Sequence, residues 1–279
     1  ETELAISVVK NILLRKAINF WHYFNASPFS IIHSKLRMGK LGTDVSDFFA
    51  FRLDEYETIF IAENNLALFT ARPIECKHIF HFIDDSGNAC GVFEVNSEDF
   101  HYNLAINKSM TGGVMVGGFT HHIKYADNVV SQYDSLLSHF DFQHRGYTGF
   151  RKMGQAGFSY VHGNFGGLYF DKDENIKSLA RLRTKHVYTP QFTIKPNYDY
   201  DFIFSNPVNR KIYIKFLLIN VERTEILVYK CLAPFATNKF TFNQLGIEND
   251  CNISWETNFP VGRCVVFENN GDYFDVFHA

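Results

Sequence analysis

Apolar and polar residues alternate along much of the chain from Asp47 onward, and this period of two defines most of the predicted elements. Phe49, Phe51 and Leu53 fall on every second position, which places three large side chains on one face of an extended segment. The same pattern, bounded by short turns, predicts further strands at 58–61, 77–83, 91–95, 100–106, 114–120, 187–194, 200–204, 211–219, 224–231, 239–242, 252–255, 263–268 and 273–278. Short strands joined by short turns are typical of antiparallel β-sandwiches, so the fold class is predicted as mainly β.

Residues 4–24 show helical spacing instead. Apolar residues that approximate one helical face are Leu4, Val8, Ile12, Ala17 and Phe20. The segment also carries Lys10, Arg15 and Lys16, so a helix lying on a membrane surface is one interpretation. A helix packed on its own domain is favoured, because most amphipathic helices are of that kind. Residues 25–44 mix Pro, Ser and Gly and are predicted as an irregular link.

Two segments of the chain resemble each other, which indicates a weak internal duplication. When 68–104 is laid on 202–245 without a gap, Pro73, Lys77, Phe82 and Val92 fall on Pro207, Lys211, Phe216 and Ile226. After one short insertion, Phe100, Asn103 and Leu104 fall on Phe240, Asn243 and Leu245. Self-similarity of this kind usually means one structural unit used twice. We therefore predict two related antiparallel sandwich-like units.

The predicted organisation follows from these patterns. An N-terminal helix and link span 1–46, and a first β unit spans 47–122. A central segment at 123–195 is rich in Gly, His and aromatic residues, and includes a short helix at 126–140. A second β unit spans 196–279.

Composition and charge narrow the function classes. The 30 Phe and 14 Tyr suit half-buried strands and cores rather than an aromatic binding platform. A net charge of −3 argues against nucleic acid as the main partner, and no apolar run reaches the length of a membrane span. The 5 cysteines lack CxxC spacing, which favours buried thiols in a reducing compartment and a cytoplasmic location. Because the chain begins at Glu1, a leader or an upstream domain could have been removed.

The central segment is the best candidate for a ligand site. Its many glycines allow the backbone to approach a ligand closely. Arg145 and Arg151 could hold an anionic group, while Tyr160 could stack on a sugar or a base and Asn164 could offer an amide. An equally weighted interpretation is that these glycines mark turns and bulges between further strands. The first functional hypothesis is therefore a binding protein for a glycan or small polar ligand, with its site between the two units.

Histidines support a second hypothesis, a metal-dependent enzyme. The segment 117–122, GGFTHH, is predicted to occupy the place of 274–279, FDVFHA, in the duplication. If the units pack about a pseudo-twofold axis, a His-rich centre could bind Zn²⁺ or Fe²⁺ and activate water. Its candidate ligands are His121, His144, His162, His186 and His278. His78 and His81 are excluded as a pair, because residues three apart on a strand face opposite sides.

Several motifs fail on inspection. No GxGxxG or Walker sequence occurs, and His162–Gly167 lacks the GxSxG partner of an esterase site. Asp171, Asp173 and Asn175 begin like an EF-hand loop, but Ile176 stands where Gly is needed. A structural or assembly subunit without any pocket stays as the third hypothesis.

Overall fold

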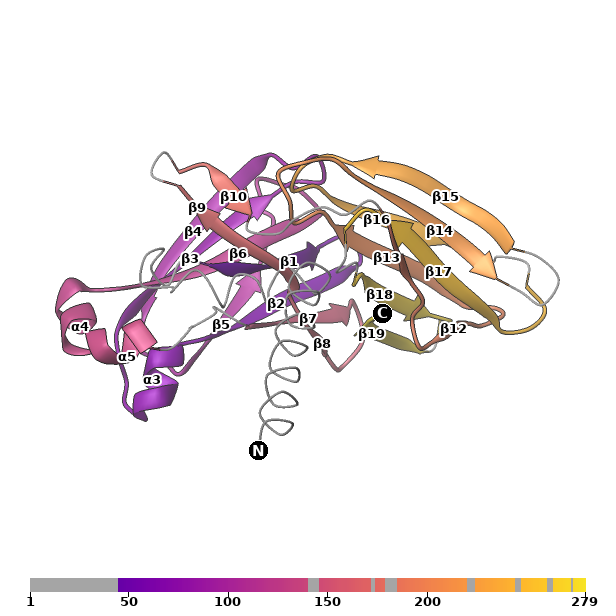
Figure 1. Ribbon diagram of the computed structural model, residues 1–279. Helices are drawn as coiled ribbons and strands as arrows, with labels where there is room; N and C mark the ends of the chain where they lie inside the picture. The colour runs from indigo at the N-terminus through magenta and orange to yellow at the C-terminus, as the bar shows by residue number, and fades with distance from the viewer. Residues whose placement is uncertain are drawn as a thin grey trace, which may run out of the picture.

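The computed structural model describes residues 45–139, 146–171, 174–178, 185–219, 224–243, 247–259, 263–271 and 273–279. The predicted helix at 4–24 and the link at 25–44 lie outside the described residues. Within them the protein is built of antiparallel strands with three short helices (Figure 1). The prediction of a mainly β, sandwich-like protein is confirmed.

In the structure the first unit comprises ten strands in two sheets, because strands β7 to β10 of the central segment belong to it. Its elements are β1 (Ser46–Arg52), β2 (Tyr56–Glu63), α3 (Asn65–Thr70), β3 (Cys76–Ile83), β4 (Ala89–Ser97), β5 (His101–Ile106), β6 (Val116–Tyr125), α4 (Asp127–Gln132), α5 (Asp134–His139), β7 (Gly146–Lys152), β8 (Ser159–His162), β9 (Asn164–Phe170) and β10 (Ile176–Ser178). One sheet has the order β10-β9-β1-β6-β3-β4, and the other has the order β5-β2-β7-β8. The helix predicted over 126–140 is instead the two short helices α4 and α5, separated at Tyr133.

The second unit comprises the remaining nine strands. They are β11 (His186–Tyr188), β12 (Thr193–Ile194), β13 (Asp199–Ser205), β14 (Ile212–Ile219), β15 (Thr224–Leu232), β16 (Thr237–Phe242), β17 (Cys251–Thr257), β18 (Val265–Asn269) and β19 (Phe274–His278). One sheet runs β11-β17-β14-β15, with β12 also paired to β17, and the other runs β16-β13-β18-β19.

The two units share one topology, which gives the duplication a structural basis. The order β5-β2-β7-β8 corresponds to β16-β13-β18-β19, and β4-β3-β6-β1 corresponds to β15-β14-β17-β11. The chain visits these positions in the same sequence in both units. Phe82 and Phe216, paired by the sequence alignment, lie on the corresponding strands β3 and β14. Strands of the central segment complete these sheets, since β7 pairs with β2, β9 with β1, and β11 with β17.

One detail of the predicted duplication is wrong. The segment 117–122 lies in β6, whose counterpart is β17, whereas 274–278 forms β19, whose counterpart is β8. His278 therefore corresponds to His162 rather than to His121 or His122, because His162 pairs with Tyr147 on β7 as His278 pairs with Val265 on β18. A short Phe- and His-containing sequence does not identify a strand, since many strands share that composition.

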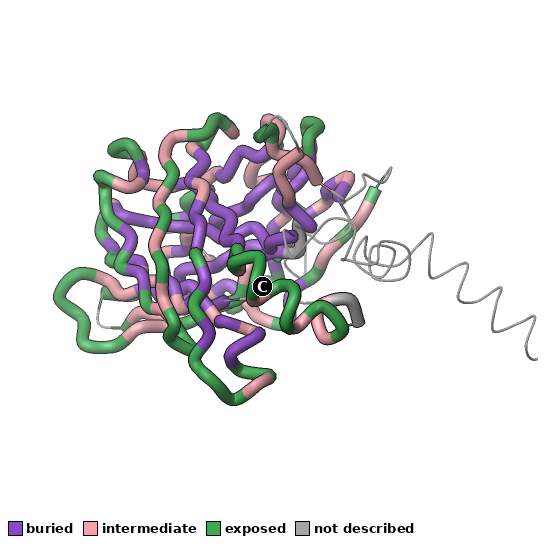
Figure 2. Tube along the Cα trace, turned by 90° about the vertical axis from the view of Figure 1, so that its left-hand side faces the viewer, coloured by how far each residue is buried: buried purple, intermediate pink, exposed green. Residues whose placement is uncertain are grey.

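Each unit has its own aromatic core. In the first, Phe60 packs edge-on against Phe49 and Phe119, with ring centroids 4.7 and 5.1 Å apart. In the second, Phe202 and Phe216 meet at 5.3 Å above the fully buried Trp255. Figure 2 shows these buried strands in the interior and exposed turns around the rim. The many phenylalanines are thus largely core residues, and burying each contributes about 1.5–3 kcal/mol.

A third apolar cluster joins the units. It comprises Ala50, Tyr56, Phe150 and Val161 from the first unit, and Ile203, Val265, Phe267 and Val276 from the second. Beside it, β8 and β19 run next to each other (Figure 1), and Ser159 Oγ donates to Asp275 Oδ1 at 3.0 Å. The duplicated strands therefore meet at the centre of the molecule.

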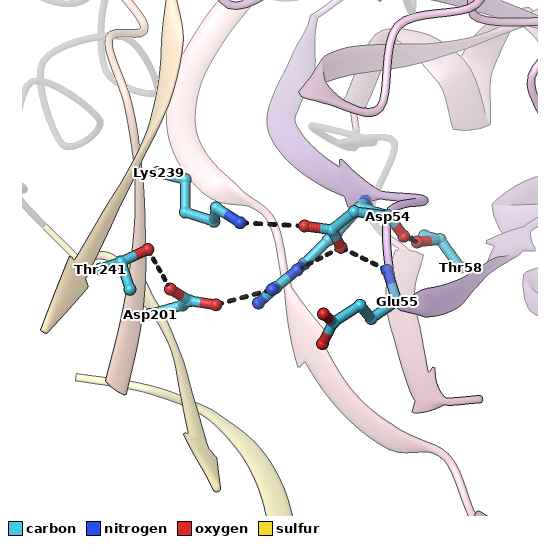
Figure 3. A network of polar contacts seen from close by, with 7 residues as sticks. Asp54, Glu55, Thr58, Asp201, Lys239 and Thr241 are labelled. Carbon is cyan, nitrogen blue, oxygen red and sulfur yellow. Dashed lines mark hydrogen bonds and ion pairs between the residues drawn. The ribbon is translucent and has the colours of Figure 1, made fainter. Parts of the chain in front are cut away.

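A buried ion-pair network crosses the same interface, as Figure 3 shows. Arg52 is 3 % exposed, and its Nε and Nη2 atoms lie 2.7 Å from Asp54 Oδ1 and 2.6 Å from Asp201 Oδ2. The guanidinium also lies 4.0 Å above the Tyr56 ring. Lys239 Nζ reaches Asp54 Oδ2 at 2.9 Å. Burial acts to raise the pKa of Asp54, but the hydrogen bond and the charge of Arg52 outweigh it and lower this pKa to about 2.

The turns of the two units also touch, and one glycine permits the contact. Gly87 has φ +91°, and an added Cβ would lie 1.9 Å from the carbonyl oxygen of Pro234. Gly87→Ala is expected to lower the free energy of unfolding by about 2–4 kcal/mol, from backbone strain plus displaced packing. Chemical denaturation measures the loss. Gly113→Ala is the matched control, since Gly113 has φ +86° with open space around it. Equal losses in the two variants would contradict the proposed contact.

Candidate ligand cavity

A cavity of about 220 Å³ opens where the two units meet. We call it the polar cavity. It is lined by Asp47, Gly146, Tyr147, His162, Gly163, Asn164, Arg263 and His278. These residues come from β1, β7, β8 and β9 of the first unit, and from β19 and the segment before β18 of the second. A molecule bound there would contact both units.

The backbone path between β8 and β9 shapes the cavity. β8 ends at His162 and β9 begins at Asn164, so the chain leaves the sheet of β7 and joins the sheet of β1 at Gly163. A Cβ at Gly163 would lie 2.7 Å from both Asp47 Cβ and Phe49 Cε1. Only glycine fits this crossing without displacing core atoms, which explains one of the many glycines of the central segment.

His162 and His278 form a stacked pair in the lining of the polar cavity. Their ring centroids are 6.0 Å apart with an interplanar angle of 13°. His278 Nε2 lies 2.6 Å from the carbonyl oxygen of His162, so this nitrogen carries the proton and donates. Burial lowers the pKa of His278, with its hydrogen bonds to backbone groups acting in the opposite direction. His278 is therefore a neutral ring near pH 7.

Asn164 supplies the most informative polar group. Its side chain is 7 % exposed. Its Oδ1 atom is buried and has no hydrogen-bond partner among the described residues. Leaving a buried amide oxygen unsatisfied costs about 1–3 kcal/mol. An unsatisfied oxygen on a residue that lines a cavity calls for a donor that the described residues do not supply.

The remaining walls combine an aromatic ring with opposite charges. Tyr147 is 39 % exposed, and its ring centroid lies 5.4 Å from that of His162. Asp47 is 6 % exposed, and Arg263 lies on the opposite unit with an exposed side chain. The walls thus offer donors, acceptors and an aromatic surface without an excess of either charge. This suits a polar ligand with several hydroxyl or amide groups.

Of the predicted ligand contacts, the structure places one in this cavity and two elsewhere. Asn164 lines it. Tyr160 is on the exposed face of β8, opposite Gly149. Arg151 lies at the far end of β7, where its Nε donates to Glu57 Oε2 at 2.9 Å and its guanidinium covers Phe158. Arg145 and His144 lie outside the described residues.

The predicted metal ligands are not brought together. His162 and His278 share the polar cavity. His121 is buried in the first core, where its Nε2 lies 2.9 Å from His78 Nδ1. His186 lies on β11 opposite Thr257. In the part of the chain that the structure describes, no three His, Cys, Asp or Glu side chains are grouped as a metal site.

Sequence reasoning missed Asp47 and Arg263 as cavity residues. Asp47 and Arg263 lie far apart in the sequence, and no local pattern marks either. The signal that could have found the cavity is the duplication, because His162 and His278 occupy corresponding strand positions. A correct strand alignment would have placed them on the corresponding strands β8 and β19, which lie next to each other.

Comparisons with known proteins leave the family open. No protein-family model and no curated protein matches the chain. A structure of the infectious bursal disease virus Gx strain is 8 % identical with a TM-score of 0.16, covering 84 % of this chain and 55 % of that chain. Oxalate decarboxylase from Bacillus subtilis is 9 % identical with a TM-score of 0.12, covering 81 % and 71 %. The chain spans about half the length of the viral chain, and neither likeness supports a conclusion. Among the described helices, none has the length and apolar character needed to cross a bilayer.

Proposed function

We propose that the protein binds a small polar ligand, of the glycan class, in the polar cavity between its two units. The observation that carries the proposal is the buried, unsatisfied Oδ1 atom of Asn164, a residue that lines a cavity of about 220 Å³. A hydroxyl group of a sugar would satisfy this oxygen once the amide turns toward the cavity. The adjacent Tyr147 ring offers an apolar face to sugar C–H groups, while neutral His278 and Arg263 surround the remaining hydroxyls.

The position of the cavity supports a binding role. Its walls belong to strands that the cores and the third apolar cluster hold in place. Polar groups fixed on rigid strands bind with little loss of conformational entropy. The backbone of the site is thus preorganised, and side-chain adjustment is enough to receive a ligand.

Asn164→Leu tests the proposal. Leu keeps the approximate volume but removes the acceptor, so affinity for a glycan selected on a glycan array is expected to fall tenfold or more. Titration calorimetry measures this change. Tyr160→Ala is the control, because Tyr160 is exposed outside the cavity, and its affinity should match that of the unmodified protein.

Two outcomes would contradict the proposal. One is a glycan that binds equally well to the Asn164→Leu variant. The other is near-stoichiometric zinc or iron in protein purified without chelating resin, which would favour the alternative of a metal-dependent enzyme. The observation that favours this alternative is the short distance of 6.0 Å between the ring centroids of His162 and His278.

A further inference from the structure

A second cavity adjoins the polar cavity. It measures about 520 Å³ and is lined by Tyr188, Thr189, Gln191, Phe192, Arg263, Phe277, His278 and Ala279. We call it the aromatic cavity. His278 and Arg263 line both cavities, so the two lie side by side with these residues at their junction.

The walls of the aromatic cavity are rings fixed by the second core. Phe192 meets Phe277 edge-on with ring centroids 5.0 Å apart, and both pack against the core residues of the second unit. Tyr188 stacks on the buried Trp255 at 4.9 Å, and its hydroxyl donates to the backbone oxygen of Ala279 at 2.9 Å. These rings are half-buried, so part of each ring is accessible, while packing against the core of the second unit fixes its orientation. Rigid aromatic surface of this kind contributes contact area at low entropic cost.

The volumes of the two cavities indicate that they bind one ligand together. Sites for drug-sized ligands usually measure about 300–1,000 Å³. The polar cavity, at about 220 Å³, is below this range, and the addition of about 520 Å³ brings the pair inside it. The chemistry also changes along the pair, from amide, imidazole and charged groups at Asn164 to ring faces at Phe192.

We infer that the ligand is an oligosaccharide of at least two sugar rings, with one ring in the polar cavity and the next against the aromatic wall at Phe192. This inference rests on the proposed function, because it extends the same site. Sugar rings combine hydroxyl edges, which need donors and acceptors, with C–H faces that pack on aromatic rings. Arg263 and neutral His278 stand at the junction, where the glycosidic linkage and its flanking hydroxyls would lie. The lining of the polar cavity has one acidic and one basic side chain, Asp47 and Arg263, so it has no excess of either charge that would select a charged ligand.

The test compares sugar length with cavity variants. The probes are the one- to four-unit members of the β-linked N-acetylglucosamine, β-linked glucose and α-linked glucose series, measured by titration calorimetry. For the series that binds, affinity is expected to rise tenfold or more from one unit to two and then to level off. Phe192→Leu, which preserves apolar volume without a ring face, should remove most of this rise and leave the affinity of the single sugar unchanged. Phe158→Ala is the control, because that ring lies outside both cavities beneath Arg151.

The outcomes separate the two proposals. Two results would overturn the two-ring inference and leave the proposed function standing. One is a disaccharide that binds no tighter than the single sugar, and the other is a gain in affinity from one sugar unit to two that persists in Phe192→Leu. Equal losses of affinity for the single sugar and the disaccharide in Phe192→Leu would also overturn it, since the substitution would then affect binding by disturbing the fold. If no glycan of the array binds and no member of the three series binds at millimolar concentration, the proposed function itself fails.

Discussion

Arg52→Met is expected to lower the free energy of unfolding by about 2–4 kcal/mol, among the largest losses from any single polar substitution in this protein. Removing one partner of a buried ion pair typically costs about 3–5 kcal/mol, because the other charge is left in a poorly solvated place. Here Asp201 and Asp54 are 16 % and 25 % exposed, so water recovers part of that cost. Met retains the apolar contact with the Tyr56 and Phe267 rings. Urea denaturation followed by far-ultraviolet circular dichroism measures the loss.

The position of Arg52 adds a second expected result. The side chain joins β1 of the first unit to Asp201 on β13 of the second. When this connection is removed, the units should unfold less cooperatively, with a lower slope of free energy against urea or two resolved transitions. Because the pKa of Asp54 is lowered in the folded protein, its contribution is present above pH 3.8 and is lost as the pH falls toward 2. The difference between the variant and the unmodified protein should therefore shrink in strong acid.

Arg151→Met provides the matched control. Arg151 also pairs with a carboxylate and covers an aromatic ring, but its side chain is 33 % exposed and that of Glu57 is 47 % exposed. Exposed pairs contribute about 0–1 kcal/mol, so this variant should unfold almost like the unmodified protein. Equal losses for Arg52→Met and Arg151→Met would show that the network in Figure 3 does not hold the units together.

Local patterns predicted strands well, because alternation depends only on which face of each strand is buried. The predicted strand at 77–83 is β3 at Cys76–Ile83, and that at 224–231 is β15 at Thr224–Leu232. The duplication also held, since it rests on repeated spacing between such strands. Pairing between distant strands could not be predicted, because backbone hydrogen bonds carry no side-chain signature. For that reason the pairing of β7 with β2 was not foreseen.

The candidate site was predicted in part for the same reason. Asn164, His162 and His278 were selected as site residues because the central segment and the histidines stand out in composition. The cavity that unites them depends on how β8 and β19 meet, which is a tertiary property. Arg151 was selected for its charge, and its ion pair with Glu57 depends on the register of β7 against β2.

Mild acid is expected to destabilise the protein through a buried histidine. His78 is fully buried, and burial lowers its pKa to about 4. Between pH 6.5 and 4 the unfolded chain binds this proton and the folded protein does not. Stability present above pH 6.5 is therefore lost as the pH falls, by up to about 3 kcal/mol from His78 alone. Burial also lowers the pKa values of His81 and His278, which act in the same direction.

The contacts of His78 explain why the neutral ring is preferred. Its Nδ1 lies 2.9 Å from His121 Nε2, and its Nε2 lies 3.4 Å from Cys76 Sγ. The ring also stacks on Tyr102 with centroids 5.3 Å apart. A positive charge on His78 would be poorly solvated, because both His78 and the adjacent His121 are fully buried. Burial also raises the pKa of Cys76 to about 12, so the neighbouring thiol provides no negative charge.

His78→Phe separates titration from packing. The ring keeps the stacking position but cannot bind a proton, so the fall in unfolding free energy between pH 7.5 and pH 4.5 should be smaller by about 2–3 kcal/mol than in the unmodified protein. Phe82→Leu is the control on the same strand, since Phe82 is fully buried against Phe51 and Phe119, and its loss lowers core packing without removing a titratable group. If His78→Phe and Phe82→Leu each shift the curve by a constant amount at every pH, His78 is not the acid-sensitive group. In that case His78, paired with His121, would bind a proton in the folded protein as readily as in the unfolded chain.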